Sequence, residues 1–388
     1  MDGAAFPLTD PTLPLFLYGT LRDAALFKAV AGPGTARRTA ARLADHRVIS
    51  APGGQMPGLV PAPGEVARGV LVEGLSEAQQ ARLDAYELDY GYDLRPVRVE
   101  TAGGPRDARA YILRDAGGEG RAPWDYEGWA EKFGPATALA ADEFFAHEPP
   151  LSAAELDRQW PMMMMRAFAR LRAGAGVPPA DVRHRPAPGD LTLRRRAPMS
   201  GDFFKHDRML VDHRRFDGGR EKDLPREVLV GADAALVLPY DPARGRVLLV
   251  EQLRMGAARR GDANPWSLEP VAGIVDAGET PEEAAHREAF EEAGVRFRSL
   301  HHMFAIYASP GSTTDHFYCF LGVTDLPDGH QATGGLESEA EDLRLHVLPF
   351  DAALDLIDTG EANAGPLVAM LLWLARARDR LEFAGGGP

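Results

Sequence analysis

Residues 273–295 read GIVDAGETPEEAAHREAFEEAGV, and this stretch decides how the second half of the chain folds. Thr280 is typical of a helix N-cap, and Pro281 suits the first helical position because its missing N–H would have no partner there. Glu283, three residues after the threonine, completes a capping box. Gly294 is typical of a residue that ends a helix. The pattern therefore predicts a helix with defined ends between residues 280 and 294.

Three glutamates share one face of this helix. Glu288, Glu291 and Glu292 stand at positions i, i+3 and i+4, so their carboxylates project from one side. Like charges this close repel one another, and carboxylate oxygens suit Mg²⁺ or Mn²⁺ better than zinc. A solvated surface helix would explain the charges alone, but not their combination with the cap and the glycines. We predict a divalent metal site that takes Mg²⁺, with Mn²⁺ as the other candidate.

The same residues match a known signature. The stretch resembles the Nudix box, the catalytic loop-helix-loop of Nudix hydrolases, on the following positions: Gly273, Glu279, Arg287, Glu288, Glu291, Glu292, Gly294 and Val295. Members of this family cut a diphosphate linked to another group. The resemblance implies a second domain with the α/β/α sandwich of a Nudix fold.

Blocks outside the box narrow the substrate class. VEQLR (250–254), PWSLE (265–269), SPG (309–311) and EAEDLR (339–344) follow in the order and spacing seen in ADP-ribose pyrophosphatases. This resemblance implies hydrolysis of ADP-ribose to AMP and ribose 5-phosphate. A pyrophosphatase for GDP-mannose or another nucleoside diphosphate sugar stays open as the alternative.

The resemblance also implies a set of metal ligands. Glu288 and Glu292 would be the principal ones, and Glu291 would assist them as part of the catalytic helix. The backbone carbonyl of Ala272 and the late-loop carboxylate of Glu341 would complete the set. Bound Mg²⁺ ions could then neutralise the diphosphate oxygens and lower the pKa of a bound water.

Four further roles follow from the same resemblance. Glu339 would be the base that orients or deprotonates the attacking water, and Arg254 would hold a phosphate with its planar donor fork. Arg226 and Glu227 match a pair that contacts substrate from the partner subunit. The resemblance therefore implies a homodimer formed through the second domain.

The N-terminal region carries a second pattern. A short apolar strand, Leu13–Tyr18, meets a turn at Gly19, and backbone N–H groups exposed at such a turn can hold a ligand carboxylate. The YGTL run resembles the opening of gamma-glutamylcyclotransferase-like (AIG2-like) proteins through four residues: Tyr18, Gly19, Thr20 and Leu21. The resemblance implies a β-barrel domain with helices.

LDAYE (83–87) resembles the segment that bears the catalytic glutamate of those proteins. Glu87 would be the general base that lets an amine attack a gamma-carbonyl and close 5-oxoproline. Leu88 stands where those proteins usually have glycine. Two alternatives therefore stay open: a gamma-glutamyl cyclotransferase-type enzyme that uses Glu87 for its main chemistry, and a domain that binds a metabolite without turnover.

The segment between these regions predicts the domain organisation. A helical pattern runs from Ser152 to Gly174, and we expect it to be interrupted at Pro161. Its four consecutive methionines would point in all directions around a helix, which favours core packing over a metal site. We predict a mixed α/β chain in three parts: a cyclotransferase-like domain (1–150), a helical extension and Pro-rich linker (151–190), and a Nudix domain (191–388).

Composition excludes several partners. A formal net charge of −14 over 388 residues argues against a nucleic-acid backbone as ligand. The most apolar run, residues 366–375, is shorter than the roughly 20 residues that a membrane span needs. The N-terminus lacks a signal-peptide pattern and Cys319 is the single cysteine, so we expect a cytoplasmic protein. The domain combination resembles bacterial Nudix proteins associated with tellurite resistance.

Overall fold

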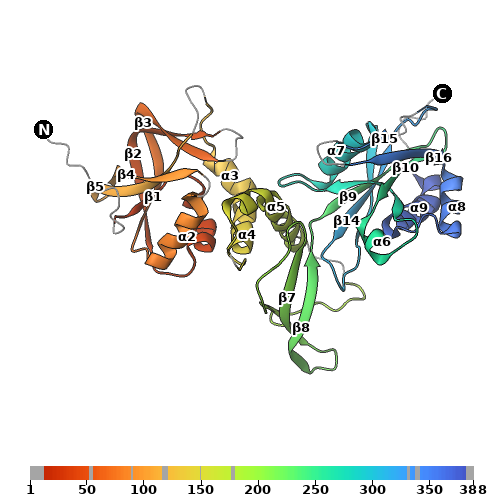
Figure 1. Cartoon of the computed structure of the whole chain (residues 1–388), viewed down its shortest axis with the longest axis horizontal. Helices are drawn as coiled ribbons and strands as arrows, with labels where there is room; N and C mark the ends of the chain where they lie inside the picture. The colour runs from red at the N-terminus through yellow and green to blue at the C-terminus, as the bar shows by residue number, and fades with distance from the viewer. Residues whose placement is uncertain are drawn as a thin grey trace. The chain divides into compact units, whose positions relative to one another are not determined.

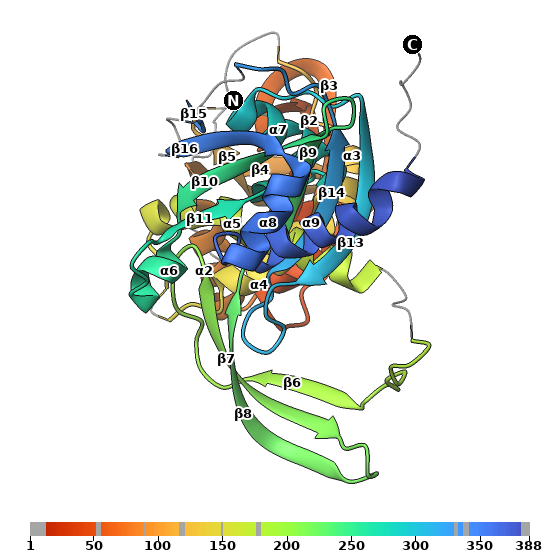
Figure 2. The same cartoon turned by 90° about the vertical axis from the view of Figure 1, so that its right-hand side faces the viewer.

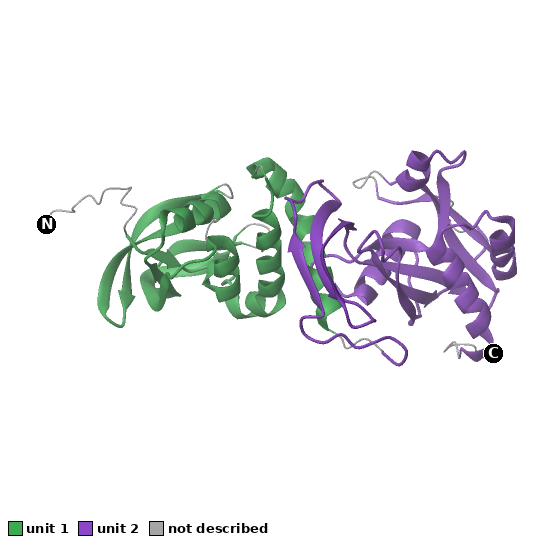
Figure 3. Ribbon diagram, turned by 90° about the horizontal axis from the view of Figure 1, so that it is seen from below, with its two compact units in different colours: residues 1–177 green, residues 178–388 purple. Residues whose placement is uncertain are grey.

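The chain forms two compact units, Met1–Val177 and Pro178–Pro388 (Figure 3). The computed structural model describes residues 13–51, 56–88, 91–115, 121–148, 150–175, 180–329, 333–336 and 341–381. The division falls inside the segment that the sequence assigns to a helical extension and linker, and the helix of that segment belongs to unit 1.

Unit 1 is built on a closed barrel of five strands (Figure 1). The strands are β1 (Leu15–Leu17), β2 (Arg37–Ser50), β3 (Pro57–Glu73), β4 (Tyr92–Thr101) and β5 (Gly104–Leu113). β1 closes the barrel by pairing antiparallel with β3 and parallel with β5. Apolar side chains that alternate along the strands fill the interior: Phe16, Leu43, Leu59, Leu71, Val99 and Ala110. The β-barrel expected for the N-terminal domain is confirmed.

The helices of unit 1 lie between its strands and after the last of them in the chain. They are η1 (Thr20–Arg22), α1 (Ala24–Ala31), α2 (Glu77–Glu87), α3 (Tyr126–Lys132), α4 (Gly134–Phe144) and α5 (Ala153–Ala175). α2 begins at a capping box in which the Ser76 hydroxyl accepts from the Gln79 N–H at 3.2 Å, and Gln79 Oε1 accepts from the Ser76 N–H at 3.2 Å. Because α2 ends at Glu87, its last turn presents that carboxyl group.

α5 continues through Pro161, so the expected interruption of the helix is wrong. Proline removes one backbone hydrogen bond, but both halves of α5 are held by packing. Met163 and Met164 are buried, which confirms core packing for these two. Arg166 is buried as well and donates to Glu143 of α4, with Nη2–Oε1 at 2.6 Å and Nε–Oε2 at 3.1 Å. Leu156, before the proline, is buried too, so α5 is packed on both sides of Pro161.

Unit 2 is organised by an eight-stranded sheet. Its strands are β9 (Ala234–Asp241), β10 (Arg246–Leu253), β11 (Trp266–Glu269), β12 (Val271–Ile274), β13 (Ser299–Tyr307), β14 (His316–Val323), β15 (Thr333–Gly334) and β16 (Leu343–Pro349). The main order is β13-β14-β9-β10-β16-β15, with β11 paired to β10 and β12 paired to β9. β14 and β9 run parallel, and the other pairs are antiparallel.

Helices cover both faces of this sheet (Figures 1 and 2). α7 (Pro281–Ala293) packs four alanines against one face, and α8 (Phe350–Thr359) and α9 (Gly365–Ala377) pack against the other. α6 (Met255–Arg260) follows β10, and the short helix η4 (Arg378–Arg380) follows α9. The α/β/α sandwich is therefore confirmed. In the described part of the chain, no helix is long and apolar enough to cross a membrane.

A separate three-stranded sheet projects from the rest of unit 2 (Figure 2). It contains β6 (Leu191–Arg195), β7 (Lys205–Arg214) and β8 (Arg220–Val230). The apolar run at residues 228–239 divides between β8 and β9. The end of β8 is joined to the segment before β14, because the Leu229 N–H bonds the Ser312 carbonyl at 2.9 Å and the Gly231 N–H bonds the Thr314 hydroxyl at 3.0 Å.

Candidate functional site

The catalytic helix suggested by the sequence is α7, and local hydrogen bonds define both of its ends. The Thr280 hydroxyl accepts from the Glu283 N–H at 3.2 Å, and the Glu283 carboxylate accepts from the Thr280 N–H at 2.8 Å. Gly294 adopts the left-handed conformation (φ 64°) that a helix C-cap requires. These contacts fix which face of the helix turns toward β12.

Arg287 is the centre of an ionic network on α7. Its guanidinium group donates to both carboxylate oxygens of Glu279, at 3.1 and 2.9 Å, and to the Ile274 carbonyl at 3.0 Å. It also reaches Glu288 at 2.6 Å and Glu291 at 3.1 Å. Burial lowers the pKa of Arg287, but these carboxylates outweigh that effect and raise it. The network ties the loop before α7 to the helix and holds Glu291 against Arg287.

Glu288 and Glu292 form a carboxylate pair beside β12, in which Glu292 is buried and Glu288 is partly buried. Burial raises the pKa of Glu288 to about 7, with Arg287 opposing the shift. Burial and the charge of Glu288 raise the pKa of Glu292 to about 9, although Glu292 accepts a hydrogen bond from the Ala272 N–H at 3.2 Å. Gly273 makes room for this pair, because a Cβ there would lie 1.8 Å from the Glu288 carboxylate.

Arg254 and Glu341 lie close enough to the carboxylate pair for their charges to act on it. Arg254 lowers the pKa of Glu292, whereas Glu341 raises it. The Arg254 guanidinium group is held by Glu269 of β11 through Nε–Oε1 at 2.8 Å and a second bond from Nη2 to Oε2. Sequence reasoning did not assign Glu269 a role. Its position could have suggested a role, because Glu269 lies three residues after Trp266 in the PWSLE block, and this block pairs with β10.

The donor chemistry fits a hard divalent cation. Glu288 and Glu292 are oxygen ligands of like charge, and their raised pKa values show that the protein alone leaves the pair under-compensated. A divalent cation would supply the missing charge. Within the ranges that the structure describes, no three Asp, Glu, His or Cys side chains converge into a complete metal site.

Two of the predicted residues, Arg226 and Glu227, are not brought to this cluster. Glu339 lies outside the described residues. Arg226 and Glu227 lie exposed on β8, where Arg226 bonds the Pro225 carbonyl at 2.8 Å and Glu227 approaches His206 at 3.4 Å. A single copy of the chain therefore holds this pair in the projecting sheet.

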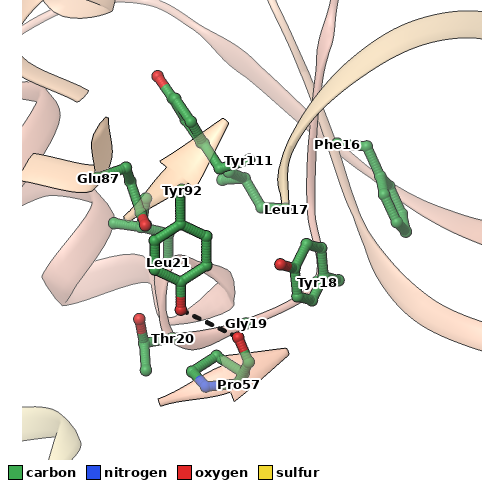
Figure 4. Close-up of a pocket in the computed structure, with 10 residues that line it drawn as sticks. All are labelled: Phe16, Leu17, Tyr18, Gly19, Thr20, Leu21, Pro57, Glu87, Tyr92 and Tyr111. Atoms are coloured by element: carbon green, nitrogen blue, oxygen red, sulfur yellow. Dashed lines mark hydrogen bonds between the residues drawn. The ribbon is translucent and has the colours of Figure 1, made fainter. Parts of the chain in front are cut away.

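Unit 1 contains a pocket with about 290 Å³ of space, counting its open mouth (Figure 4). The YGTL run and Glu87, predicted from separate parts of the sequence, line this one pocket. The complete lining is Phe16, Leu17, Tyr18, Gly19, Thr20, Leu21, Pro57, Glu87, Tyr92 and Tyr111. A Cβ at Gly19 would lie 2.5 Å from the Pro57 ring, so glycine is required for this close approach.

Sequence reasoning missed the two tyrosines that come from the barrel strands. The Tyr92 hydroxyl donates to the Pro57 carbonyl at 2.9 Å, and the Tyr111 hydroxyl donates to Asp84 at 2.6 Å. Both hydroxyl groups are therefore engaged within the protein. An aromatic residue in a strand usually indicates core packing, so the sequence offered no signal that these two reach the pocket.

Tyr18 and Glu87 give the pocket its reactive polar groups. The buried Tyr18 hydroxyl makes no hydrogen bond of normal geometry. Burial raises its pKa, and the Glu87 charge adds to the effect. Burial also raises the pKa of Glu87 to about 8. Near neutral pH the pocket thus combines a buried phenol with a carboxyl group that is mostly protonated.

Comparisons with known proteins match the two units to two different families. A family model described as a NUDIX domain matches residues 231–371, and one described as gamma-glutamyl cyclotransferase, AIG2-like, matches residues 15–131. An ADP-ribose pyrophosphatase of Haemophilus influenzae is 38% identical over 176 residues, which are 44% of this chain and 80% of that protein.

Two Escherichia coli proteins are also similar. The ADP-ribose pyrophosphatase of strain K12 is 34% identical over 50% of this chain and 91% of its own length. A GDP-mannose pyrophosphatase of strain O1:K1 / APEC is 32% identical over 47% of this chain and 94% of its own length. The second unit is thus similar to both kinds of enzyme over most of their lengths.

Proposed function

Because the chain belongs to the Nudix hydrolases and carries an N-terminal domain of the gamma-glutamyl cyclotransferase, AIG2-like family, we propose that its second unit hydrolyses ADP-ribose to AMP and ribose 5-phosphate. The observation that carries the proposal is the carboxylate pair Glu288 and Glu292 beside Arg254. The similarity to two ADP-ribose pyrophosphatases supports this substrate over GDP-mannose, whose pyrophosphatase is the less similar relative.

The chain's own residues divide the work. Glu288 and Glu292, with the Ala272 carbonyl and Glu341, would hold Mg²⁺, which when bound supplies Lewis acidity and lowers the pKa of water. Arg287 keeps the Glu288 and Glu291 carboxylates in place through its bonds at 2.6 and 3.1 Å.

Two residues act on the substrate and the water in this proposal. Arg254, oriented by Glu269, would bind a diphosphate oxygen with a planar fork of donors. Glu339 remains our candidate for the base that orients the attacking water.

The projecting sheet supports assembly as a homodimer. Leu193, Val211 and Leu224 form one row across β6, β7 and β8, and Arg226 lies on the same face in the next row. Leu193 is 54% exposed, so one copy of the chain leaves this apolar face uncovered. We propose that a second copy covers it and brings Arg226 and Glu227 to the partner's substrate.

The dimer is tested by light scattering after size exclusion. Leu193→Glu should give a monomer with reduced ADP-ribose turnover, whereas Leu372→Glu, which changes another exposed leucine of unit 2, should leave both properties unchanged. A monomeric wild type would contradict this part of the proposal.

The activity is tested by product analysis with Mg²⁺ on a panel of ADP-ribose, GDP-mannose, NADH and diadenosine polyphosphates. We expect AMP and ribose 5-phosphate from ADP-ribose, and loss of this activity with EDTA or with Glu292→Gln. Glu282→Gln is the matched control because Glu282 is an exposed carboxylate on the same helix. If a folded wild type leaves ADP-ribose intact but cleaves GDP-mannose, the substrate assignment is wrong.

Unit 1 supports a second candidate function. The Tyr18 hydroxyl and the Glu87 carboxyl line one pocket (Figure 4), which supports a cyclotransferase in which the ionised form of Glu87 takes a proton from an amine as that amine attacks a gamma-carbonyl, and the proton leaves with the displaced amine. Formation of 5-oxoproline from gamma-glutamyl amines tests this function. Glu87→Gln should abolish it, and Glu77→Gln, an exposed change on the same helix, should not. Binding of such amines without product would indicate a sensor.

A further inference from the structure

Two of the metal ligands in the proposed function come from distant parts of the sequence, Glu292 on α7 and Glu341 after β15. Residues Gly334 and Gly335 lie between them. The Gly335 N–H donates to the Glu292 carbonyl at 3.3 Å. This carbonyl is one of the last in α7 and has no partner within the helix, so the bond from β15 satisfies a group that a helix end leaves open.

Gly334 allows the two backbones to meet. A Cβ at this position would lie 1.7 Å from the Glu292 carbonyl oxygen and 2.9 Å from its carbonyl carbon. Both are backbone atoms of a helix, and they cannot move aside without moving the Glu292 side chain. Gly334 is also paired with Leu343 in the sheet, so β15 has little freedom to move away.

Gly335 makes the corresponding contact with the other ligand. Its φ of +93° is a conformation that residues with a Cβ rarely adopt. A Cβ there would lie 2.8 Å from the Glu341 Cβ. The next residue, Leu336, donates its N–H to the Glu341 carboxylate at 3.3 Å and accepts from the Glu341 N–H at 3.2 Å. The backbone at Gly335 and Leu336 therefore determines where the Glu341 carboxylate lies.

We propose that the Gly334–Gly335 pair is a positioning element that sets the separation between the Glu292 and Glu341 carboxylates and so completes the divalent-cation site. The inference rests on the proposed function, because it takes both glutamates as ligands of one site. Neither glycine touches the substrate. Their contribution is the close approach of two backbones, which no side chain can replace.

The first test is Gly334→Ala in the full-length protein, with Gly365→Ala as the control because a Cβ at Gly365 meets open space. Mn²⁺ affinity is measured by calorimetry without substrate, and kcat and KM are measured with ADP-ribose and Mg²⁺. We expect Mn²⁺ binding to weaken about 10-fold to 100-fold, the range typical of lost supporting contacts at metal sites. We expect kcat to fall more than KM rises, because Arg254 belongs to a different segment, at the N-terminus of α6.

A double-variant comparison separates positioning from a general loss of stability. Gly335 contacts Glu341, so Gly335→Ala should weaken Mn²⁺ binding in the wild type but have little further effect in a Glu341→Gln background. Gly335→Ala is the second variant if Gly334→Ala does not fold, since its closest contact, 2.8 Å from the Glu341 Cβ, is less severe than the 1.7 Å contact at Gly334.

The possible outcomes distinguish this inference from the proposed function. If Gly334→Ala and Gly335→Ala fold and bind Mn²⁺ as the wild type does, the positioning role is refuted, whatever the substrate proves to be. Equal weakening by Gly335→Ala in the wild-type and Glu341→Gln backgrounds would also refute it. If the wild type binds Mn²⁺, Gly334→Ala weakens that binding, and ADP-ribose is not cut, the positioning role stands and the proposed function fails.

Discussion

Replacing Glu87 by glutamine should change how the stability of unit 1 depends on pH. Burial raises the pKa of Glu87 from 4.5 to about 8, so the folded unit keeps a proton that the unfolded chain has already lost. The folded state therefore binds more protons between these two pKa values, and its free energy of unfolding falls as the pH rises. Above about pH 8 the dependence on Glu87 levels off. Glutamine does not titrate and removes this slope.

The size of the effect follows from the shift. One pKa unit corresponds to about 1.4 kcal/mol, so the interval from about pH 5.5 to 8 gives an upper limit of about 3 kcal/mol. Glu87 lines an open pocket rather than a sealed core, and water at the mouth reduces the cost of ionisation. We expect the stability difference between Glu87→Gln and the wild type to grow by about 1–2 kcal/mol over that interval.

The assay must report on unit 1 within the intact chain. In a Trp266→Phe, Trp373→Phe background the remaining tryptophans all belong to unit 1: Trp124, Trp129 and Trp160. Urea unfolding followed by their fluorescence at several pH values gives the free energy of unfolding of this unit.

Glu77→Gln is the control, because it removes an exposed carboxylate from the same helix. Parallel curves of unfolding free energy against pH for the wild type and Glu87→Gln would refute the reasoning. The burial of Glu87 would then not be the source of its altered proton affinity.

Three further changes have calculable outcomes. Arg166→Met leaves the Glu143 carboxylate, which is 12% exposed, without its bidentate partner. The free energy of unfolding of unit 1, measured in urea, should fall by about 3–5 kcal/mol. A fall below about 1 kcal/mol would contradict a buried pair. Gly19→Ala places a Cβ 2.5 Å from the Pro57 ring, so it should lower the free energy of unfolding of unit 1 by about 1–3 kcal/mol and reduce 5-oxoproline formation. Unchanged melting and turnover would contradict this prediction. The pKa of Glu292 without metal is about 9, and a cation binds the ionised form. Mg²⁺ affinity measured by calorimetry should therefore rise about tenfold per pH unit between about pH 7 and 9. An affinity that does not change with pH would count against Glu292 as a ligand.

Features that depend on neighbouring residues could be predicted from the sequence. The ends of α7 follow from Thr280, Glu283 and Gly294, whose hydrogen bonds all form within one turn of the helix. The shared pocket of Glu87 and the YGTL run followed from a family resemblance instead, since nothing in their sequence separation brings them together.

Other features were hidden because they depend on partners that are distant in the chain. β2 carries RRTAARLADHRVIS, whose charged residues obscure the strand, and it forms because 13 of its residues pair with β3. Pro161 indicated a break in α5, but the buried Arg166–Glu143 pair and two methionines outweigh one lost hydrogen bond. The contact of Gly334 with Glu292 has no local signature, because glycine in a loop usually indicates only a turn.

Closure of the barrel in unit 1 has a consequence for how this protein behaves at high concentration. A sheet that ends in open strands offers unpaired N–H and C=O groups to other chains, and this is a common origin of aggregation. Among the strands described, β1 joins β3 to β5, so the barrel presents no such edge. Fusing a closed barrel to a second unit therefore adds a pocket to the chain without adding a sheet that ends in an open strand.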